Sequence, residues 1–219
     1  MKNIRRIFLG IFLAFSFAAG LFAETESPIF DDKMLLEGYA KKYSQEPKDV
    51  LLAMIKDDDL TPYMSAAAIH VFRERFSKEV VGKEKNIIEK ILLRRLNRTN
   101  SIFVEIEAMH TLCMMDRYQY FNSVIPALIE FLDHYNSAVN DLAFNSTNEI
   151  LSKGLKRPRE ARIVFNTLRR NLYLTRKKFE DIEEPGPKLK QKLELLRWAI
   201  KILGTQELQR LPPEIIDFL

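Results

Sequence analysis

Val104-Glu-Ile-Glu-Ala108-Met-His-Thr-Leu112 is one of three stretches of this chain that share a pattern. Met64-Ser-Ala-Ala-Ala68 and Val139-Asn-Asp-Leu-Ala143 show the same order, an apolar residue followed four positions later by alanine. The stretches recur about every 35 to 40 residues, which is the length of two helices and their turns in a repeat protein. Units of this kind bury their apolar faces only by stacking on one another. The sequence therefore predicts a repeat architecture, and it favours binding over catalysis.

The chain after residue 28 is predicted to be helical. Apolar residues recur there at helical spacing, and no stretch alternates as a strand does. Proline or glycine stands at the breaks, as in Thr61-Pro62 and Arg157-Pro158, where proline suits the first turn of a helix. Helices are expected over residues 31–44, 48–57, 61–77, 83–97, 101–115, 118–134, 137–153, 158–176 and 188–203, with a closing turn near 213–218.

The two helices of an expected pair share a motif where one ends and the next begins. One helix ends in Leu128-Ile-Glu-Phe-Leu132-Asp133, and the next helix carries Val139 and Ala143. That order, Leu-x-x-x-Leu-Asp followed by Val-x-x-x-Ala, resembles the motif of the HEAT repeat family. The preceding unit also matches, and the one around residues 51–68 matches less closely. The likeness covers residues 48–176. It implies an all-α fold, a right-handed α-solenoid of about four antiparallel helix pairs of the HEAT/armadillo type.

The chain departs from the HEAT motif at one position. An arginine commonly follows the valine of the second helix in that family, and it pairs with the aspartate of a neighbouring repeat. Glu105 and Asn140 stand at this position here. The resemblance therefore gives no support for an Asp–Arg ladder between the repeats of this chain.

The first residues have the layout of a secretory signal peptide. Lys2, Arg5 and Arg6 precede an uncharged run over residues 7–23, which ends in small residues and is followed at once by Glu24. Cleavage after Ala23 is expected. An uncleaved anchor and a buried first helix are the alternatives, because the run is slightly long for a signal and slightly short for a membrane span. The sequence thus predicts an exported protein of the bacterial periplasm or envelope, anchored to the inner membrane only if residues 7–23 are retained.

The expected organisation has five parts. They are a signal peptide (1–23), an N-terminal helical cap (24–47), HEAT-like repeats (48–178), a linker rich in proline and glycine (179–187) and a C-terminal helix with its cap (188–219).

The overall charge is a weak guide to function. The chain has 34 Lys and Arg against 30 Asp and Glu, a net charge of +4. Lys2, Arg5 and Arg6 supply three of these four positive charges. The remaining chain is close to neutral, so its basic character alone does not indicate nucleic-acid binding.

Residues that could carry chemistry are few. His70 and His110 occupy equivalent places in neighbouring repeats, but neighbouring helices lie about 10 Å apart, too far for a shared metal ion. Cys113 lies among apolar residues and is expected to be a buried filler. Asp57-Asp58-Asp59 precedes a helix start, where capping and dipole compensation are favoured over a cation site. The sequence has no phosphate-binding glycine loop, nucleophile elbow or paired-histidine zinc motif. We therefore expect no enzyme activity, cofactor or metal.

One segment stands out by its charge. Residues 153–178 contain ten Lys and Arg and a single acid, Glu160. On a helix over 158–176, the apolar residues share one face and the cations occupy an adjacent stripe, which the HEAT resemblance would place on the concave face. The residues of this cationic stripe proposed for partner binding are Arg159, Arg162, Arg169, Arg170, Tyr173, Arg176 and Lys177.

Several roles for the cationic stripe remain open. The acids of residues 180–184 follow directly and could fold back to neutralise it. It could instead hold an acidic protein partner, or an anionic lipid or polysaccharide. Nucleic acid is disfavoured because export separates the chain from it.

The sequence therefore predicts an exported, non-catalytic HEAT-repeat scaffold that binds a protein or another anionic partner in the periplasm or envelope. The alternative is a HEAT-like protein that binds or modifies nucleic acid, which requires that residues 1–23 are not an export signal.

Overall fold

The described part of the chain is all-α, as predicted. The computed structural model describes residues 29–115, 121–152, 158–180 and 182–219, and no strand occurs within them. The proposed signal peptide, residues 1–23, lies outside the described residues. None of the helices in the described ranges combines the length and apolar character needed to cross a membrane.

Each expected helix is present, with ends that differ by a few residues. The element missed by the sequence analysis is the 3₁₀ helix η3 (Thr205–Arg210). Two further 3₁₀ turns, η1 (Phe131–Asp133) and η2 (Arg176–Lys178), extend the helices before them. The α-helices are α2 (Ile29–Tyr43), α3 (Lys48–Lys56), α4 (Pro62–Phe76), α5 (Lys83–Arg98), α6 (Ile102–Met114), α7 (Phe121–Glu130), α8 (Ser137–Ser152), α9 (Pro158–Thr175), α10 (Pro187–Leu203) and α11 (Pro213–Ile216).

Proline and glycine mark the helix ends for identifiable reasons. Pro62 and Pro187 occupy the first turns of α4 and α10, where a missing N–H costs no hydrogen bond. Gly204 ends α10 with φ at 107°, in the region that favours glycine, and its N–H donates to the Ile200 carbonyl at 2.8 Å. The chain then turns directly into η3.

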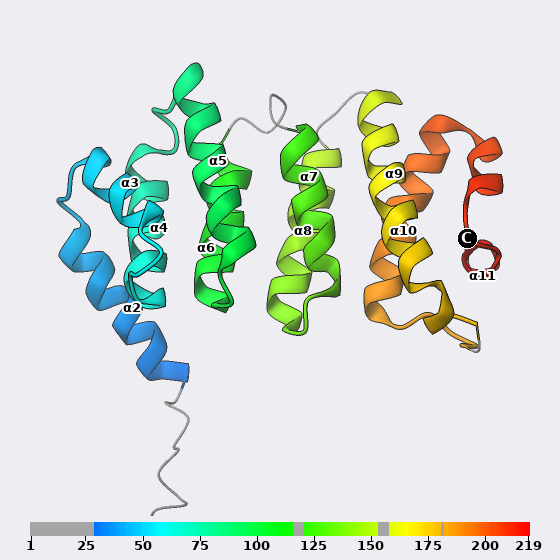
Figure 1. Cartoon of the computed structure of the whole chain (residues 1–219), viewed down its shortest axis with the longest axis horizontal. Helices are drawn as coiled ribbons and strands as arrows, with labels where there is room; N and C mark the ends of the chain where they lie inside the picture. Colours follow the sequence, from blue (N-terminus) through cyan, green and yellow to red (C-terminus); the bar gives the residue numbers. More distant parts are fainter. Residues whose placement is uncertain (1–28, 116–120, 153–157, 181) are drawn as a thin grey trace, which may run out of the picture.

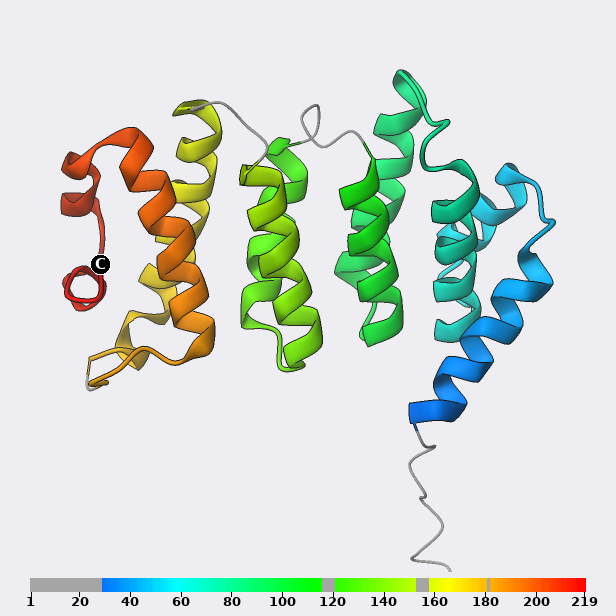
Figure 2. The same cartoon turned by 180° about the vertical axis from the view of Figure 1, so that it is seen from behind.

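The helices lie in two layers of consecutive pairs. Helix α3 packs on α4, α5 on α6, α7 on α8 and α9 on α10. The second helices also contact one another in order, α4 on α6 and α6 on α8, and α2 covers the free side of α4. The pairs follow one another along the long axis of the molecule in chain order (Figure 1). The second layer is seen from behind (Figure 2).

The repeated alanines belong to the second helices α4, α6 and α8, which pack on one another in order. Ala68, Ala108 and Ala143 are fully buried, as are Val104 and Val139. A small side chain at a helix crossing lets two backbones approach closely, which explains why alanine recurs at this place. Cys113, in the same layer, is buried as expected.

The acidic run at residues 57–59 joins two helix pairs, so the capping interpretation is wrong for Asp58. The N-cap residue of α4, Thr61, makes no side-chain capping bond, and the first turn of α4 contains no acid. The Asp58 carboxylate instead accepts hydrogen bonds from three arginines of α5. They are Arg94 at 2.7 Å, Arg95 at 3.1 Å and Arg98 at 3.0 Å.

The two residues that replace the family arginine make other contacts. The Glu105 carboxylate lies 3.2 Å from His134 Nε2, in the turn of the next pair. The Asn140 side chain donates to the Leu132 carbonyl. Both residues at this motif position therefore contact the turn between α7 and α8, Glu105 through His134 and Asn140 through the Leu132 carbonyl.

A second contact between pairs, here named the polar junction, consists of Asp133, Asn171 and Lys192. Lys192 is 2% exposed, and its Nζ donates to both Asp133 carboxylate oxygens and to Asn171 Oδ1, each at 2.6 Å. Asn171 Nδ2 donates to Asp133 at 3.0 Å. Burial would raise the pKa of Asp133, but the bonds from Lys192 and Asn171 outweigh it and lower that pKa. The polar junction therefore holds η1, α9 and α10 together.

Replacing Lys192 with alanine is expected to destabilise the protein. The change leaves Asp133 and Asn171 without their shared donor and opens a cavity between α9 and α10. Because Asp133 is half exposed, we expect a loss of about 2 kcal/mol, below the range for fully buried pairs. Urea unfolding measures it. Lys190→Ala removes the same charge from the exposed side of α10 and is the control; equal midpoints for the two variants would contradict the role of the polar junction.

Candidate anion-binding groove

Helix α9 has one buried face and one charged edge, as its sequence predicts. The apolar residues Ala161, Val164, Phe165, Leu168 and Leu172 are fully buried. They pack toward α7 and α10, the two helices in closest contact with α9. Burying this face fixes the rotation of the helix, and the adjacent cationic stripe is therefore held at the surface.

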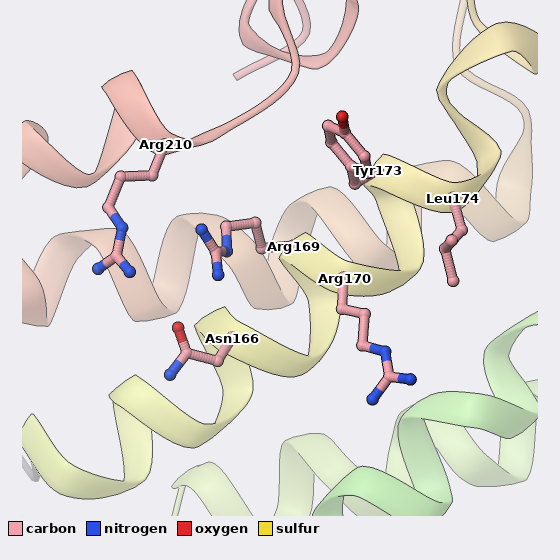
Figure 3. A pocket seen from close by; sticks show the side chains of 6 residues that line it. All are labelled: Asn166, Arg169, Arg170, Tyr173, Leu174 and Arg210. Atoms are coloured by element: carbon pink, nitrogen blue, oxygen red, sulfur yellow. The ribbon is translucent and has the colours of Figure 1, made fainter.

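A groove of about 650 Å³ lies along the exposed edge of α9 and is completed by η3. Arg169 and Arg210 extend toward each other across it, one from α9 and one from η3 (Figure 3). Arg170 points the other way, toward the green ribbon of the neighbouring pair. The lining residues are Asn166, Arg169, Arg170, Tyr173, Leu174 and Arg210. Three of the six are arginines and none is an acid.

A second groove, of about 470 Å³, lies on the other side of α9 against α7. Its floor on the α7 side includes Pro126 and Ile129, and it contains one carboxylate, that of the exposed Glu130. Three residues line both grooves: Asn166, Arg170 and Leu174.

Part of the cationic stripe is neutralised internally. Arg162 Nη1 lies 2.7 Å from Glu207 Oε2 on η3, and Arg210 Nη1 lies 3.0 Å from the same oxygen. Hydrogen bonds from Arg162 and Arg210 hold the pKa of Glu207 below its ordinary value. Glu207 therefore docks η3 on α9 and places Arg210 at the groove.

Another part of the stripe is held by stacking. The Arg176 guanidinium lies 4.3 Å from the centre of the Tyr173 ring, and its Nη1 donates to the Tyr173 carbonyl at 2.9 Å. This cation–π contact orients the ring, which is 56% exposed at the edge of the groove.

The remaining cations of the stripe have no acidic partner in the part of the chain that the structure describes. Arg169 and Arg170 line the groove, while Arg159 and Lys177 are exposed at either end of the stripe. The expected alternative, neutralisation by the following acids, has no support from Glu180, Glu183 and Glu184. These three side chains are exposed and form no ion pair with the stripe.

Arg169 has no acidic partner among the described residues and faces Arg210 across the groove, so the two guanidinium groups repel each other. A bound anion relieves this repulsion. Arginine also presents paired N–H donors that match the two oxygens of a carboxylate or phosphate. The groove is therefore suited chemically to hold such a group between Arg169 and Arg210.

Arg210 was missed by the sequence analysis. It lies in η3, a segment without helical periodicity, and contacts made only in the folded chain bring it beside α9: Glu207 pairs with both Arg210 and Arg162, and the Arg210 guanidinium lies over the Phe165 ring. The sequence contains one hint of this contact, the acid Glu207 in a segment C-terminal to the cationic helix. That acid alone does not indicate which arginines it pairs with.

The repeat histidines, His70 and His110, lie near the ion pair of Arg73 and Glu107. His70 Nδ1 is 3.4 Å from Glu107 Oε1, and Arg73 pairs with the other oxygen of Glu107. No cluster of His, Cys, Asp and Glu suited to a metal ion occurs among the described residues.

Comparisons with family models, curated proteins and solved structures gave no match to this chain.

Replacing Glu207 with glutamine is expected to lower the unfolding midpoint at pH 7, because Arg162 and Arg210 lose their shared charge. A carboxyl whose pKa is lower in the folded state than its ordinary value of 4.5 stabilises the fold at pH values above 4.5. This stabilisation is lost as the pH falls through the folded-state pKa. The difference between the two proteins should therefore be full at pH 7 and vanish in acid. Urea unfolding of the two proteins at pH 7 and at a pH below the folded-state pKa of Glu207 tests this. Glu79→Gln, at an exposed loop position, is the control, and a difference independent of pH would contradict the ion-pair explanation.

Proposed function

We propose that this protein is an exported, non-catalytic scaffold that binds an anionic partner, preferentially a protein, through the groove of α9. In this proposal the helix pairs form a right-handed, HEAT-like α-solenoid, and the partner lies on its inner face in the periplasm or cell envelope.

The pairwise helix packing supports the solenoid part of the proposal. Consecutive pairs contact one another through their second helices, α4 on α6 and α6 on α8, and the last two pairs also through their first helices, α7 on α9. The second helices α4, α6 and α8 carry the buried alanines. Helices α3, α5, α7 and α9 belong to the other layer (Figure 1). In a HEAT-like stack this layer is the inner one, so the exposed edge of α9 would face the partner.

One observation carries the binding part of the proposal. Arg169 and Arg170 project into grooves of the surface and form no ion pair with any described residue, although Glu207 neutralises Arg162 on the same helix. Arg169 faces Arg210 across the first groove, and like charges that face each other cost stability. A bound anion would offset this cost.

The groove supports binding rather than a reaction. Its six lining residues include no carboxylate, histidine or cysteine that could act as a base or a strong nucleophile. The layout of residues 1–23 supports export, since a cationic start, an apolar run and small residues before acids are typical of signal peptides.

Retention of the purified protein on an anionic resin tests the binding proposal. We expect salt-dependent retention, which Arg169→Ala/Arg170→Ala reduces strongly because the two unpaired charges of the groove are removed. The same variant should lose the partner that wild-type protein captures from an envelope extract. The intact mass of protein recovered from cells reports whether residues 1–23 have been removed.

Lys41→Ala/Lys42→Ala is the matched control. It removes the same charge from two exposed positions of α2, far from α9 along the chain of pairs (Figure 1). If both double variants reduce retention equally, the resin responds to net charge alone and the groove is not the site.

The nucleic-acid alternative is favoured by one feature, the three arginines of the groove, which could also hold phosphates. It requires a cytoplasmic chain that retains residues 1–23. Tight, salt-dependent binding of duplex DNA together with an uncleaved N-terminus would replace the proposal above.

A further inference from the structure

We propose that the two grooves of α9 form one site for an extended peptide segment whose two ends differ in charge. Its acidic end lies between Arg169 and Arg210, and its other end, apolar or basic, lies on α7 beside Glu130. This inference rests on the proposed function and specifies the partner of the same groove.

The two grooves are continuous across α9. Asn166, Arg170 and Leu174 line both of them, so a ligand in one groove touches residues of the other. The Asn166 side chain is exposed and makes no hydrogen bond to another described residue. Its amide offers both a donor and an acceptor, which a peptide backbone can satisfy where it crosses the helix.

The end of the site at η3 selects negative charge. Arg169 and Arg210 face each other there, and no acid lines this groove. Glu207 holds Arg210 by one guanidinium nitrogen, Nη1, at 3.0 Å. The rest of that guanidinium can donate to a carboxylate while the arginine stays anchored.

The end of the site at α7 selects against negative charge. Pro126 and Leu174 provide apolar surface there, and Leu174 is 75% exposed. Glu130 adds an exposed carboxylate that forms no ion pair with a described residue. An acidic group placed at this end would be repelled, whereas a lysine would be attracted.

This uneven charge favours a peptide over the other anionic partners. The surface of an anionic membrane and a charged polysaccharide both present negative charge repeatedly along their length. Either would meet Glu130 as well as the arginines. A peptide can place acids at one end and apolar or basic residues at the other. Each groove also has the size of a site that holds a small group, so the two together suit a short extended segment.

Fluorescence polarisation with two capped, labelled peptides tests the proposal. Both peptides have glutamates at one end and an apolar middle; the first ends in lysine and the second ends in glutamate. We expect wild-type protein to bind the lysine-ended peptide more tightly.

Arg210→Ala should lower the affinity for both peptides about tenfold, since each loses a charge-assisted hydrogen bond at its acidic end.

Glu130→Lys is the decisive variant. We expect it to weaken the lysine-ended peptide and to tighten the glutamate-ended one, about threefold each way, as for an exposed ion pair. Glu79→Lys makes the same charge change at an exposed position outside the grooves and should not distinguish the peptides. Circular dichroism of each variant checks that the helices are intact.

Failure of this inference and failure of the proposed function give different results. If Arg169→Ala/Arg170→Ala abolishes binding but Glu130→Lys increases the affinity for both peptides equally, the groove binds anions without distinguishing the second end of the peptide. The inference is then wrong. Tighter binding to vesicles of phosphatidylglycerol, or to a sulfated polysaccharide, would also overturn it. If Arg169→Ala/Arg170→Ala changes no binding, the proposed function itself fails.

Discussion

The contact of Lys192 with Asp133 and Asn171 is the constraint on which the surface of α9 depends. A lysine that is almost completely buried requires its partners, because an ammonium without them would be expensive to keep out of water. Those partners come from η1 and α9, so the buried charge fixes three elements against one another. The apolar face of α9 then packs between α7 and α10. This packing fixes the rotation of the helix, so its charged edge lies at the surface.

The orientation of α9 determines which of its arginines have a partner. Glu207 on η3 takes Arg162 and one nitrogen of Arg210, Tyr173 stacks with Arg176, and Arg169 and Arg170 are left without an acid in the described part of the chain. A helix that looks uniformly cationic in sequence thus presents a local cluster of charge between two grooves. Because the unpaired charges lie beside grooves of defined shape, the site can recognise a specific partner.

Local rules were sufficient for the helices and insufficient for the contacts between them. Pro62, Pro187 and Gly204 act within one turn of their own position, and the buried alanines follow a fixed spacing, so the sequence predicts both. The sequence favoured a helix cap over a cation site for Asp58, because its arginine partners lie far along the chain on α5. Arg210 was missed for the same reason. Seven cationic-stripe residues were named from the sequence, but the contacts that hold Arg162 to Glu207 and Arg176 to Tyr173 are seen only in the folded structure.

The central claim is that Arg169 and Arg210 form one anion site, and the arginine side chains can report on it directly. The measurement is a ¹⁵N NMR titration of the arginine Nε–H signals with an acidic peptide. We expect saturable shifts for Arg169 and Arg210 and none for Arg94, which Asp58 already holds. Unmoved signals for Arg169 and Arg210, or equal shifts for all three arginines, would contradict the account.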